Sequence, residues 1–312
     1  MRRCCLILLL SYVGSEMARQ SCKTLFTHDL HGNERKYRKL LDYAIEISAE
    51  CILIGGDLGP TSLMRYLIEA QRGFFKKTLP RMLNHLRDEL PDVKLFLIMG
   101  NEDCRTNLEV LEDYDPELFE IIHERRTKLT DGINIIGYPY IPITPFKRKD
   151  WEKYDLSETP EDLLEDHLFR KVFAYNLQGY KSSIFGWRSF RFHSEMEKED
   201  SIQKDLMQPS FFKDAHRTVY LFHSPPYKTN LDQCYTGNHV GSLAIRLFIE
   251  KYQPYLTLHG HVHETVEKSG DFKQKIGNTL CLTTGNNPRN DYLALLEFCP
   301  HNPWSITRKI IY

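Results

Sequence analysis

The alternation of short apolar runs with segments of helical periodicity between residues 23 and 101 constrains the fold most strongly. The runs at 23–27, 51–54 and 93–98 have the length and composition of buried strands. Strands that alternate with helices are typical of βαβ units, in which the strands lie parallel in one sheet. The sequence therefore predicts an α/β fold with a largely parallel sheet.

Two helical segments are predicted to join these strands. Between the first and second strands, side chains recur at spacings of three and four residues, as an amphipathic helix requires. They are Leu40, Leu41, Ala44, Ile45 and Ser48. Residues 61–90 are long enough for one helix broken before Pro80 or for two helices, and either arrangement leaves the topology unchanged.

Residues 105–215 are less regular, and we expect them to form an insertion or a cap. They contain acidic helical pieces around 107–125 and 158–178, a short strand INIIGY and the aromatic stretch SIFGWRSFRF. The regular pattern resumes after residue 217. It predicts strands at VYLFH and YLTLHG, a helix over 241–251, and three further strands near 276–283, 291–298 and 304–311.

Five short polar motifs directly follow predicted strands. They are Asp29-Leu30-His31, Gly55-Gly56-Asp57, Gly100-Asn101-Glu102-Asp103, His223 and Gly260-His261-Val262-His263. In open α/β sheets, ligands bind beyond the carboxyl ends of the strands. We therefore expect these five loops to converge on one crevice, although each motif alone is also compatible with an ordinary turn or a surface histidine.

Two of the motifs place possible metal ligands two residues apart: Asp29 with His31, and His261 with His263. In an extended chain, residues i and i+2 project to the same side, and the residue between them projects to the other. Each pair would then hold one ion, while the apolar residue between its members packs inward.

The candidate ligands are imidazoles, carboxylates and an amide oxygen, without a thiolate. This set suits Mn, Fe, Zn or Co better than a structural zinc site. The seven ligands are sufficient for two divalent ions: Asp29, His31, Asp57, Asn101, His223, His261 and His263. Paired ions clamp a phosphate and activate water. Two aspartates only partly balance a charge of +4, so an anionic ester would be attracted.

The overall charge gives no second source of attraction for anions. The chain has 41 Lys and Arg against 42 Asp and Glu, a formal net charge of −1. No overall basic field therefore draws it to nucleic acid or to an anionic membrane. A local groove that includes Lys147, Arg148, Lys149 and the stretch around Trp187 is one alternative, and a packed hairpin is the other.

The cysteines and the N-terminal residues give indications of the compartment in which the protein is found. Eight cysteines show no paired metal spacing and no dense disulfide framework, so we expect reduced thiols and a cytoplasmic protein. Residues 1–22 form an N-terminal extension before a domain over 23–312. Its apolar part follows Arg2 and Arg3 and resembles a signal peptide, which is the alternative of export, but it is too short to span a membrane.

At these motifs the chain resembles the calcineurin-like metallophosphoesterases, whose pattern is D-x-H, G-D, G-N-H-D/E, H and G-H-x-H in this order. The resemblance runs from about Lys23 to Leu296. The stretches GYPYIPITPF, HSPPYKTNLD, NHVGSLAIR and GHVHE look like the subgroup related to bacterial cyclic-nucleotide phosphodiesterases. The resemblance is specific for the family and leaves the substrate open.

The resemblance implies a four-layer fold of two facing β-sheets flanked by helices. It assigns two sets of ligands: Asp29, His31, Asp57 and His263 on one metal, and Asp57, Asn101, His223 and His261 on the other. Asp57 would bridge the two ions, and a metal-bridging hydroxide would attack phosphorus in line. We expect a hydrolase of phosphate esters, most of all phosphodiesters.

One position departs from the family pattern. The family usually has a His after G-N, which contacts phosphate and helps to protonate the leaving group, whereas this chain has Glu102. A carboxyl group acts as an acid only when protonated, and an ionised one repels phosphate. We interpret Glu102 as a tentative catalytic residue that changes substrate choice. Asp103 is an alternative orienting residue.

Substrate contacts are predicted for Asn101 and His239, and Lys228 lies near the same loop. Two rival functions belong to other classes. One is a scaffold that binds proteins and has lost catalysis, which should lack the metal ligands that are present here. The other is a nuclease, which the neutral net charge disfavours. The sequence predicts a small phosphate ester as the partner and leaves the oligomeric state open.

Overall fold

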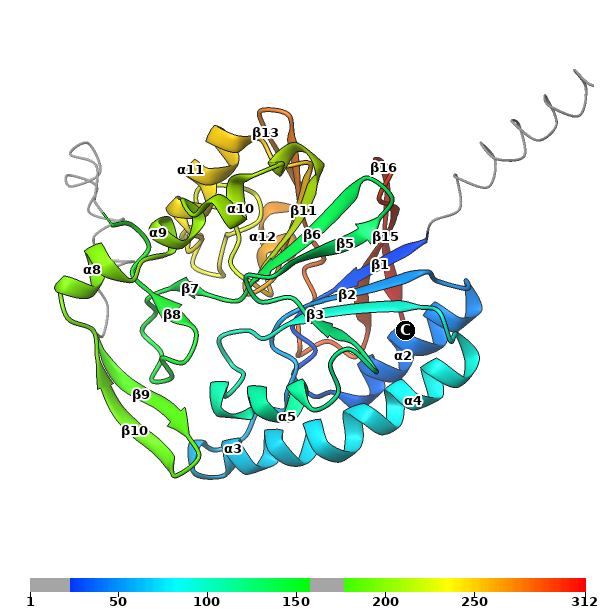
Figure 1. The fold of residues 1–312 in the computed structure, drawn as a ribbon, viewed down its shortest axis with the longest axis horizontal. Helices are drawn as coiled ribbons and strands as arrows, with labels where there is room; N and C mark the ends of the chain where they lie inside the picture. Colours follow the sequence, from blue (N-terminus) through cyan, green and yellow to red (C-terminus); the bar gives the residue numbers. More distant parts are fainter. Residues whose placement is uncertain (1–22, 158–176) are drawn as a thin grey trace, which may run out of the picture.

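Two six-stranded mixed sheets face each other in the computed structural model, which describes residues 23–157 and 177–312 (Figure 1). The first sheet has the strand order β16-β15-β1-β2-β3-β4. Its strands are β1 (Thr24–Thr27), β2 (Cys51–Gly55), β3 (Lys94–Ile98), β4 (Glu120–Ile121), β15 (Leu293–Cys299) and β16 (Asn302–Ile311). The predicted strands at 23–27, 51–54 and 93–98 are confirmed as parallel neighbours.

The second sheet has the order β13-β14-β12-β11-β6-β5. Its strands are β5 (Arg126–Thr130), β6 (Ile133–Tyr138), β11 (Thr218–Phe222), β12 (Leu256–His259), β13 (Lys273–Ile276) and β14 (Thr279–Thr283). Strands β6, β11, β12 and β14 are parallel, and β5 and β13 pair antiparallel at the edges.

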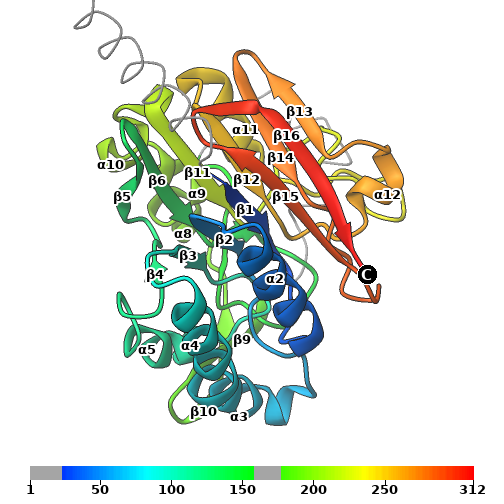
Figure 2. The ribbon, with the colours of Figure 1, turned by 90° about the vertical axis from the view of Figure 1, so that its right-hand side faces the viewer.

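Helices cover the outer face of the first sheet on one side of the molecule (Figure 2). They are α2 (Glu34–Glu46), α3 (Met64–Gly73) and α4 (Leu79–Glu89), with a π-helical turn, η1 (Phe74–Thr78), between the last two. The segment 61–90 is therefore one continuous rod of two α-helices. Pro80 lies in the first turn of α4, where a missing N–H group costs little. Ser48, predicted on the first helix, lies beyond its end.

The outer face of the second sheet is covered by α9 (Ile202–Leu206), α10 (Pro209–Phe212) and α11 (Leu243–Tyr252). The contact is aromatic, because the ring of Phe248 on α11 lies 5.1 Å from that of Tyr220 on β11. The predicted fold class, two facing sheets flanked by helices, is confirmed. The shorter helices are η2 (Arg105–Asn107), α5 (Leu108–Glu112), α8 (Glu195–Glu199), η3 (Ala215–Arg217) and α12 (Thr265–Ser269).

Apolar side chains from both sheets fill the space between them. Phe26, Leu53 and Phe96 of the first sheet belong to one buried cluster with Leu221 and Leu258 of the second. All five have no exposed surface. Each such side chain contributes roughly 1.5–3 kcal/mol by leaving water. This inner core fixes the strand ends from which the polar loops emerge.

The segment 105–215, predicted as an insertion, does not lie wholly outside the sheets. It supplies β4 to the first sheet and β5 and β6 to the second. The acidic piece at 107–125 is helical only over α5 and then forms turns and β4, and the piece at 158–178 lies largely outside the described residues. Beyond β6, the chain forms β7 (Ile141–Pro142), β8 (Glu152–Lys153) and a hairpin of β9 (Gln178–Ser183) and β10 (Gly186–Arg191).

The C-terminal part contains one more strand than predicted. The strand expected near 276–283 corresponds to β14, and β13 lies before it across a turn of Gly277 and Asn278. A Gly-Asn pair between two strands is a hairpin signal, because Gly277 takes the positive φ of 59° that such a turn needs. The predicted strand is confirmed as β14, whereas β13 was not predicted.

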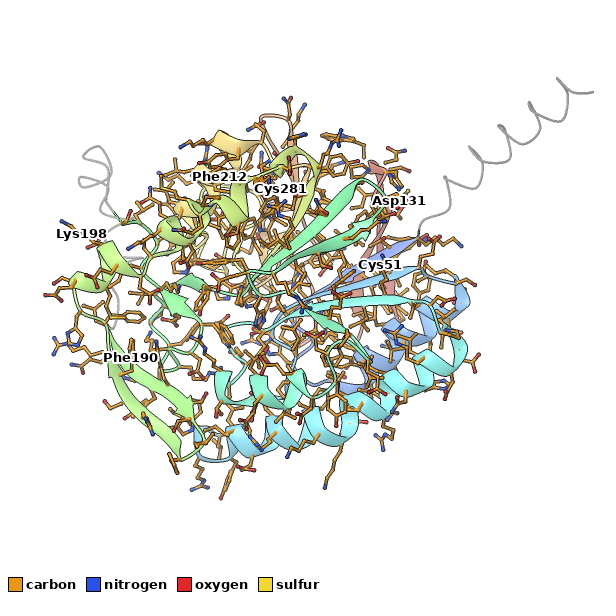
Figure 3. The ribbon with its side chains drawn as sticks, viewed as in Figure 1. Cys51, Asp131, Phe190, Lys198, Phe212 and Cys281 are labelled. Carbon is orange, nitrogen blue, oxygen red and sulfur yellow. The ribbon has the colours of Figure 1, made fainter. Side chains whose placement is uncertain are left out.

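In the described part of the chain, Cys104, Cys234, Cys281 and Cys299 are free thiols. Cys51 on β2 and Cys281 on β14 are buried in their sheets, as expected for small core residues (Figure 3). Residues 1–22, which contain the signal-like stretch, lie outside the described residues. Within residues 23–157 and 177–312, no helix is long and apolar enough to cross a membrane.

Candidate metal centre

The polar motifs meet at the carboxyl ends of strands from both sheets. Asp29, Asp57 and Asn101 follow β1, β2 and β3, which are neighbours in the first sheet. His223 follows β11, and the His261-Val262-His263 segment follows β12, its neighbour in the second sheet. The predicted convergence of the loops is therefore present in the fold, and both sheets contribute to it.

A first group of ligands consists of Asp29, His31, Asp57 and His263. One polar atom from each lies within 4.8 Å of the others. The Nε2 atoms of His31 and His263 are 3.2 Å apart, and Nε2 of His263 lies 3.6 Å from Oδ1 of Asp29. Acceptor atoms that face one another in this way need a shared proton or a cation.

A second group is centred on His223. Burial lowers the pKa of its ring, but the Asp57 carboxylate 3.6 Å away, together with Asp29 and the Gly55 carbonyl, raises the pKa to about 9. The ring donates its Nδ1–H to the Gly55 carbonyl at 2.8 Å and its Nε2–H to Oδ1 of Asn101 at 3.0 Å. The His261 ring lies beside it, with 5.4 Å between centroids. A metal ion here would replace the Nε2 proton.

Asp57 lies between the two groups. Its Oδ1 faces Nε2 of His223, and its Oδ2 lies 3.8 Å from Nε2 of His31. The side chain is 1% exposed, and its Oδ1 also accepts the backbone N–H of Glu102 at 2.8 Å. A carboxylate whose two oxygens point to different ligand groups has the geometry of a bridge.

The residues fit a bound cation. Buried polar atoms normally have a hydrogen-bond partner. Oδ1 of Asp29 and Nδ1 of His31 are buried and make no hydrogen bond within the described part of the chain. A divalent ion beside Oδ1 of Asp29 would satisfy that oxygen, and the mixture of imidazole and carboxylate donors suits a transition metal.

The electrostatics favour a cation as well. Burial by itself raises the pKa of Asp57, but His223 and His31 together lower it to about 2. Burial also acts to raise the pKa of Asp29, whereas His28 lowers it, and the net pKa lies well below the usual value. Burial lowers the pKa of His261 to about 3, which leaves its imidazole neutral. The site therefore holds two ionised carboxylates in a buried setting.

The paired motifs were predicted to lie in extended chain, but the backbone at the candidate ligands is not extended. Asp29, His31, Asp57 and His261 have φ values of 53°, 45°, 52° and 69°. Residues other than glycine rarely adopt such values, and they gather where function constrains the chain. The paired ligands are thus aimed by left-handed turns and not by an extended strand.

Backbone hydrogen bonds hold these turns in place. The N–H groups of Asp29 and His31 donate to the carbonyls of Gly56 and Asp57 at 3.0 and 2.8 Å. Asp103 accepts the N–H groups of Leu58 and Gly100 at 3.0 and 2.9 Å. Asp103 therefore orders the loops after β2 and β3. It was predicted to orient a metal ligand directly, whereas here it holds the backbone of the loops that carry the ligands.

Glu102 lies beside the first ligand group in an ion pair that the sequence did not indicate. Its Oε1 is 3.0 Å from Nη2 of Arg148, and its Oε2 is 3.6 Å from Nδ1 of His31. Nη1 of Arg148 also donates to the Glu102 carbonyl at 3.2 Å. Arg148 is thus committed to Glu102, and its neighbour Lys149 is buried in a pair with Glu152 at 2.7 Å. These pairs leave Lys147, Arg188 and Arg191 as exposed cations of the predicted groove.

A cavity of about 280 Å³ opens from the ligand groups. Asp57, Asn101, His261 and His263 line its inner end. The remaining lining residues are Glu102, Pro142, Ile143, Thr144, Pro145, Phe146, Cys234, Val240, Val262 and Glu264. The cavity therefore joins the candidate metal ligands to a largely apolar chamber.

Two predicted substrate contacts lie in different places. Asn101 lines the cavity. His239 does not line it, although its neighbour Val240 does; Nδ1 of His239 pairs with Oδ1 of the buried Asp232 at 2.7 Å. The Lys228 backbone N–H donates to the same carboxylate. Both residues thus help to order the loop 225–242.

Sequence reasoning did not identify Arg148 or the apolar wall around Ile143 and Phe146 as parts of the site. The wall lies in GYPYIPITPF, a stretch that carried the resemblance to one subgroup. That stretch was a usable signal, because a loop similar across a subgroup has a reason beyond the metal ligands.

Comparisons with known proteins identify the family of this chain. A model of the calcineurin-like phosphoesterase family matches residues 23–265. The crystal structure of TT1561 from Thermus thermophilus has a TM-score of 0.54 at 16% identity, over 92% of this chain and 97% of that one. A dimetal phosphatase from Danio rerio has a TM-score of 0.48 at 10% identity, over 94% and 96%. No curated protein matches this sequence.

Proposed function

We propose that this chain, which belongs to the calcineurin-like phosphoesterase family, uses two divalent metal ions to hydrolyse phosphodiesters. Membership of the family makes it a metal-dependent phosphoesterase. What we propose beyond this is a preference for diesters, and the charge of the residues that line the cavity supports that preference. Among the lining residues there is no Lys or Arg, whereas Glu102 and Glu264 both contribute carboxylates.

This lining favours substrates of low charge. A phosphodiester carries one negative charge at neutral pH, and a phosphomonoester carries close to two. Metal ions at the inner end would compensate either anion, but the two glutamates repel the dianion more strongly in a partly desolvated cavity. The balance of these terms supports a diester as the substrate.

The ligand assignment that the geometry supports is the one implied by the resemblance. Asp29, His31, Asp57 and His263 would hold one ion, and Asp57, Asn101, His223 and His261 would hold the other. Such ions act as Lewis acids toward the phosphoryl group and make water a stronger nucleophile. The donor set suits Mn, Fe, Zn or Co.

We propose a charge-setting role for Glu102 in place of proton donation. Its carboxylate lies between Arg148 and the Nδ1 face of His31. At 3.6 Å from Nδ1 of His31 the carboxylate is beyond hydrogen-bond distance, so it acts on the ring through its charge. The guanidinium of Arg148, 3.0 Å from Oε1, holds the Glu102 carboxylate in place beside the candidate metal ligands.

Replacing Glu102 by Gln or His should shift substrate choice toward monoesters. The variant removes one repulsive charge, so we expect the ratio of kcat/KM for p-nitrophenyl phosphate to that for methyl p-nitrophenyl phosphate to rise roughly tenfold. Arg148→Gln should move the same ratio the other way, because it leaves Glu102 without its cation. An unchanged ratio in both variants would show that this pair does not set the selectivity.

Chelation gives a direct test of the metal requirement. We expect a strong chelator to abolish diester hydrolysis and added Mn²⁺, Zn²⁺ or Co²⁺ to restore it, with two ions bound per chain by elemental analysis. The readouts are p-nitrophenolate release and metal content on the same samples. Full activity after confirmed metal removal would exclude the proposed mechanism.

The alternatives fit the structure less well. A scaffold without catalysis has no need for unpartnered buried ligand atoms such as Oδ1 of Asp29. A nuclease needs basic groups free to bind phosphates. Arg148 and Lys149 are instead engaged with Glu102 and Glu152. For location, the free thiols of Cys104 and Cys281 support the cytoplasm.

A further inference from the structure

The outer part of the cavity is apolar, and none of the proposed metal chemistry uses it. Ile143, Pro145 and Phe146 form one wall, and Val240 and Val262 contribute from other loops. Ile143 is 3% exposed, whereas Phe146 is 53% exposed and lies toward the opening. An apolar pocket that continues from a polar reaction centre is the usual form of a small-molecule site.

Buried carboxylates order both walls. On one side, Lys149 donates to the Thr144 carbonyl and to Oε2 of Glu152, each at 2.7 Å, and Glu152 in turn accepts the Thr144 N–H at 3.0 Å. Lys149 and Glu152 are 0% and 2% exposed. This network fixes the backbone that carries Ile143 and Pro145.

The opposite wall is ordered in the same manner by Asp232, which has no exposed surface. Its carboxylate accepts N–H groups from Thr229 at 2.8 Å and Gly241 at 3.0 Å, and it pairs with His239. Val240 lies between two of these partners. A pocket with walls fixed from both sides is organised before a ligand arrives, which reduces the cost of binding.

We propose that this chamber is a subsite for a small apolar ester group, such as an aryl group, on the phosphate that is hydrolysed. The proposal rests on the proposed function and names the kind of substrate. At about 280 Å³ in total, the cavity lies near the lower limit for ligand pockets, so it suits one ring or a short chain and not a diacyl lipid.

Binding to the Mn²⁺-loaded protein tests the subsite without relying on turnover. The probes are three monoanionic diesters: dimethyl phosphate, phenyl methyl phosphate and glyceryl methyl phosphate. We expect calorimetry to show phenyl methyl phosphate binding at least tenfold more tightly than dimethyl phosphate, because the ring leaves water. The glyceryl compound is extended but polar, and it should gain little.

Substitutions in the cavity wall test whether the apolar chamber causes the tighter binding of the phenyl compound. Val240→Thr keeps the volume but adds a hydroxyl group, and Phe146→Ala removes a ring, so each should reduce the phenyl-to-methyl affinity ratio about threefold or more. Phe185→Ala is the matched control, because Phe185 is 82% exposed on the turn of the β9–β10 hairpin and lies outside the cavity lining. The control should leave the ratio unchanged.

The outcomes separate the two proposals. A phenyl preference that both wall variants reduce supports the subsite, whether or not diesters are turned over. Equal affinity for the three probes, or a phenyl preference that neither wall variant alters, overturns it. Absence of diester hydrolysis in the metal-loaded protein overturns the proposed function instead.

Discussion

Replacing Asp57 by Asn is expected to lower kcat/KM for diesters by about a thousandfold or more. The variant keeps the shape of the side chain but removes the charge from the one carboxylate that faces both ligand groups, at 3.6 Å from His223 and 3.8 Å from His31. Metal-assisted hydrolysis loses most of its rate when the ions are lost or misplaced. Metal content should fall from two ions per chain in parallel with the rate.

The matched control for this variant is Asp131→Asn. Asp131 lies in the turn between β5 and β6, is 91% exposed and pairs only with nearby Lys128 in the described structure (Figure 3). The same chemical change there should leave both metal content and rate unaltered. Circular dichroism and a melting curve would establish that Asp57→Asn is folded. A folded variant with near-normal activity would contradict the assignment of Asp57 as a shared ligand.

Replacing Gly100 by Ala is expected to lower kcat/KM about a hundredfold, although Gly100 is not itself a ligand. An added Cβ would lie 2.3 Å from Oδ1 of Asp57 and 2.6 Å from Cε1 of His223. Neither side chain can yield without leaving its position, because both are buried. A displacement of about 1 Å at a reaction centre costs on the order of a hundredfold in rate.

A control for Gly100→Ala is available in Gly73→Ala. A Cβ on Gly73, the last residue of α3, meets no atom within 4 Å. Alanine in a helix is more stable than glycine by roughly 0.5–1 kcal/mol, so this variant should melt slightly higher and keep its activity. Metal affinity distinguishes the two changes: it should weaken in Gly100→Ala alone. Equal metal affinity in both variants would show that the crowding is relieved elsewhere.

The sequence predicted most strands and the meeting of the ligands because both depend on short-range patterns. Apolar runs such as 51–54 are long enough to identify a buried strand, and a polar motif directly after each run places its side chains at the same edge. The strand β13 was missed because its residues Lys273, Gln274 and Lys275 are polar and its signal is limited to the two-residue turn at Gly277 and Asn278. Boundaries of this kind depend on one or two residues.

The pairing of Glu102 with Arg148 could not be predicted from this one sequence. Arg148 lies 46 positions away and reaches Glu102 because the chain after β7 runs beside β9. There Tyr180 donates its N–H to the Lys147 carbonyl and accepts the N–H of Lys149. No local pattern encodes such a pairing. The left-handed conformation of Asp29 and His31 was also hidden, since it depends on hydrogen bonds to the neighbouring loop.

The candidate ligands are divided between the two sheets, so metal binding would couple the chemistry of this protein to its stability. Asp29, His31, Asp57 and Asn101 extend from the first sheet, and His223, His261 and His263 extend from the second. An ion held from both sides acts as a cross-link between the sheets, and unfolding must release it. Each increase in metal concentration above the dissociation constant therefore raises the free energy of unfolding. The melting temperature becomes a measure of metal supply, so a cell short of metal would lose the catalyst by unfolding as well as by inactivity.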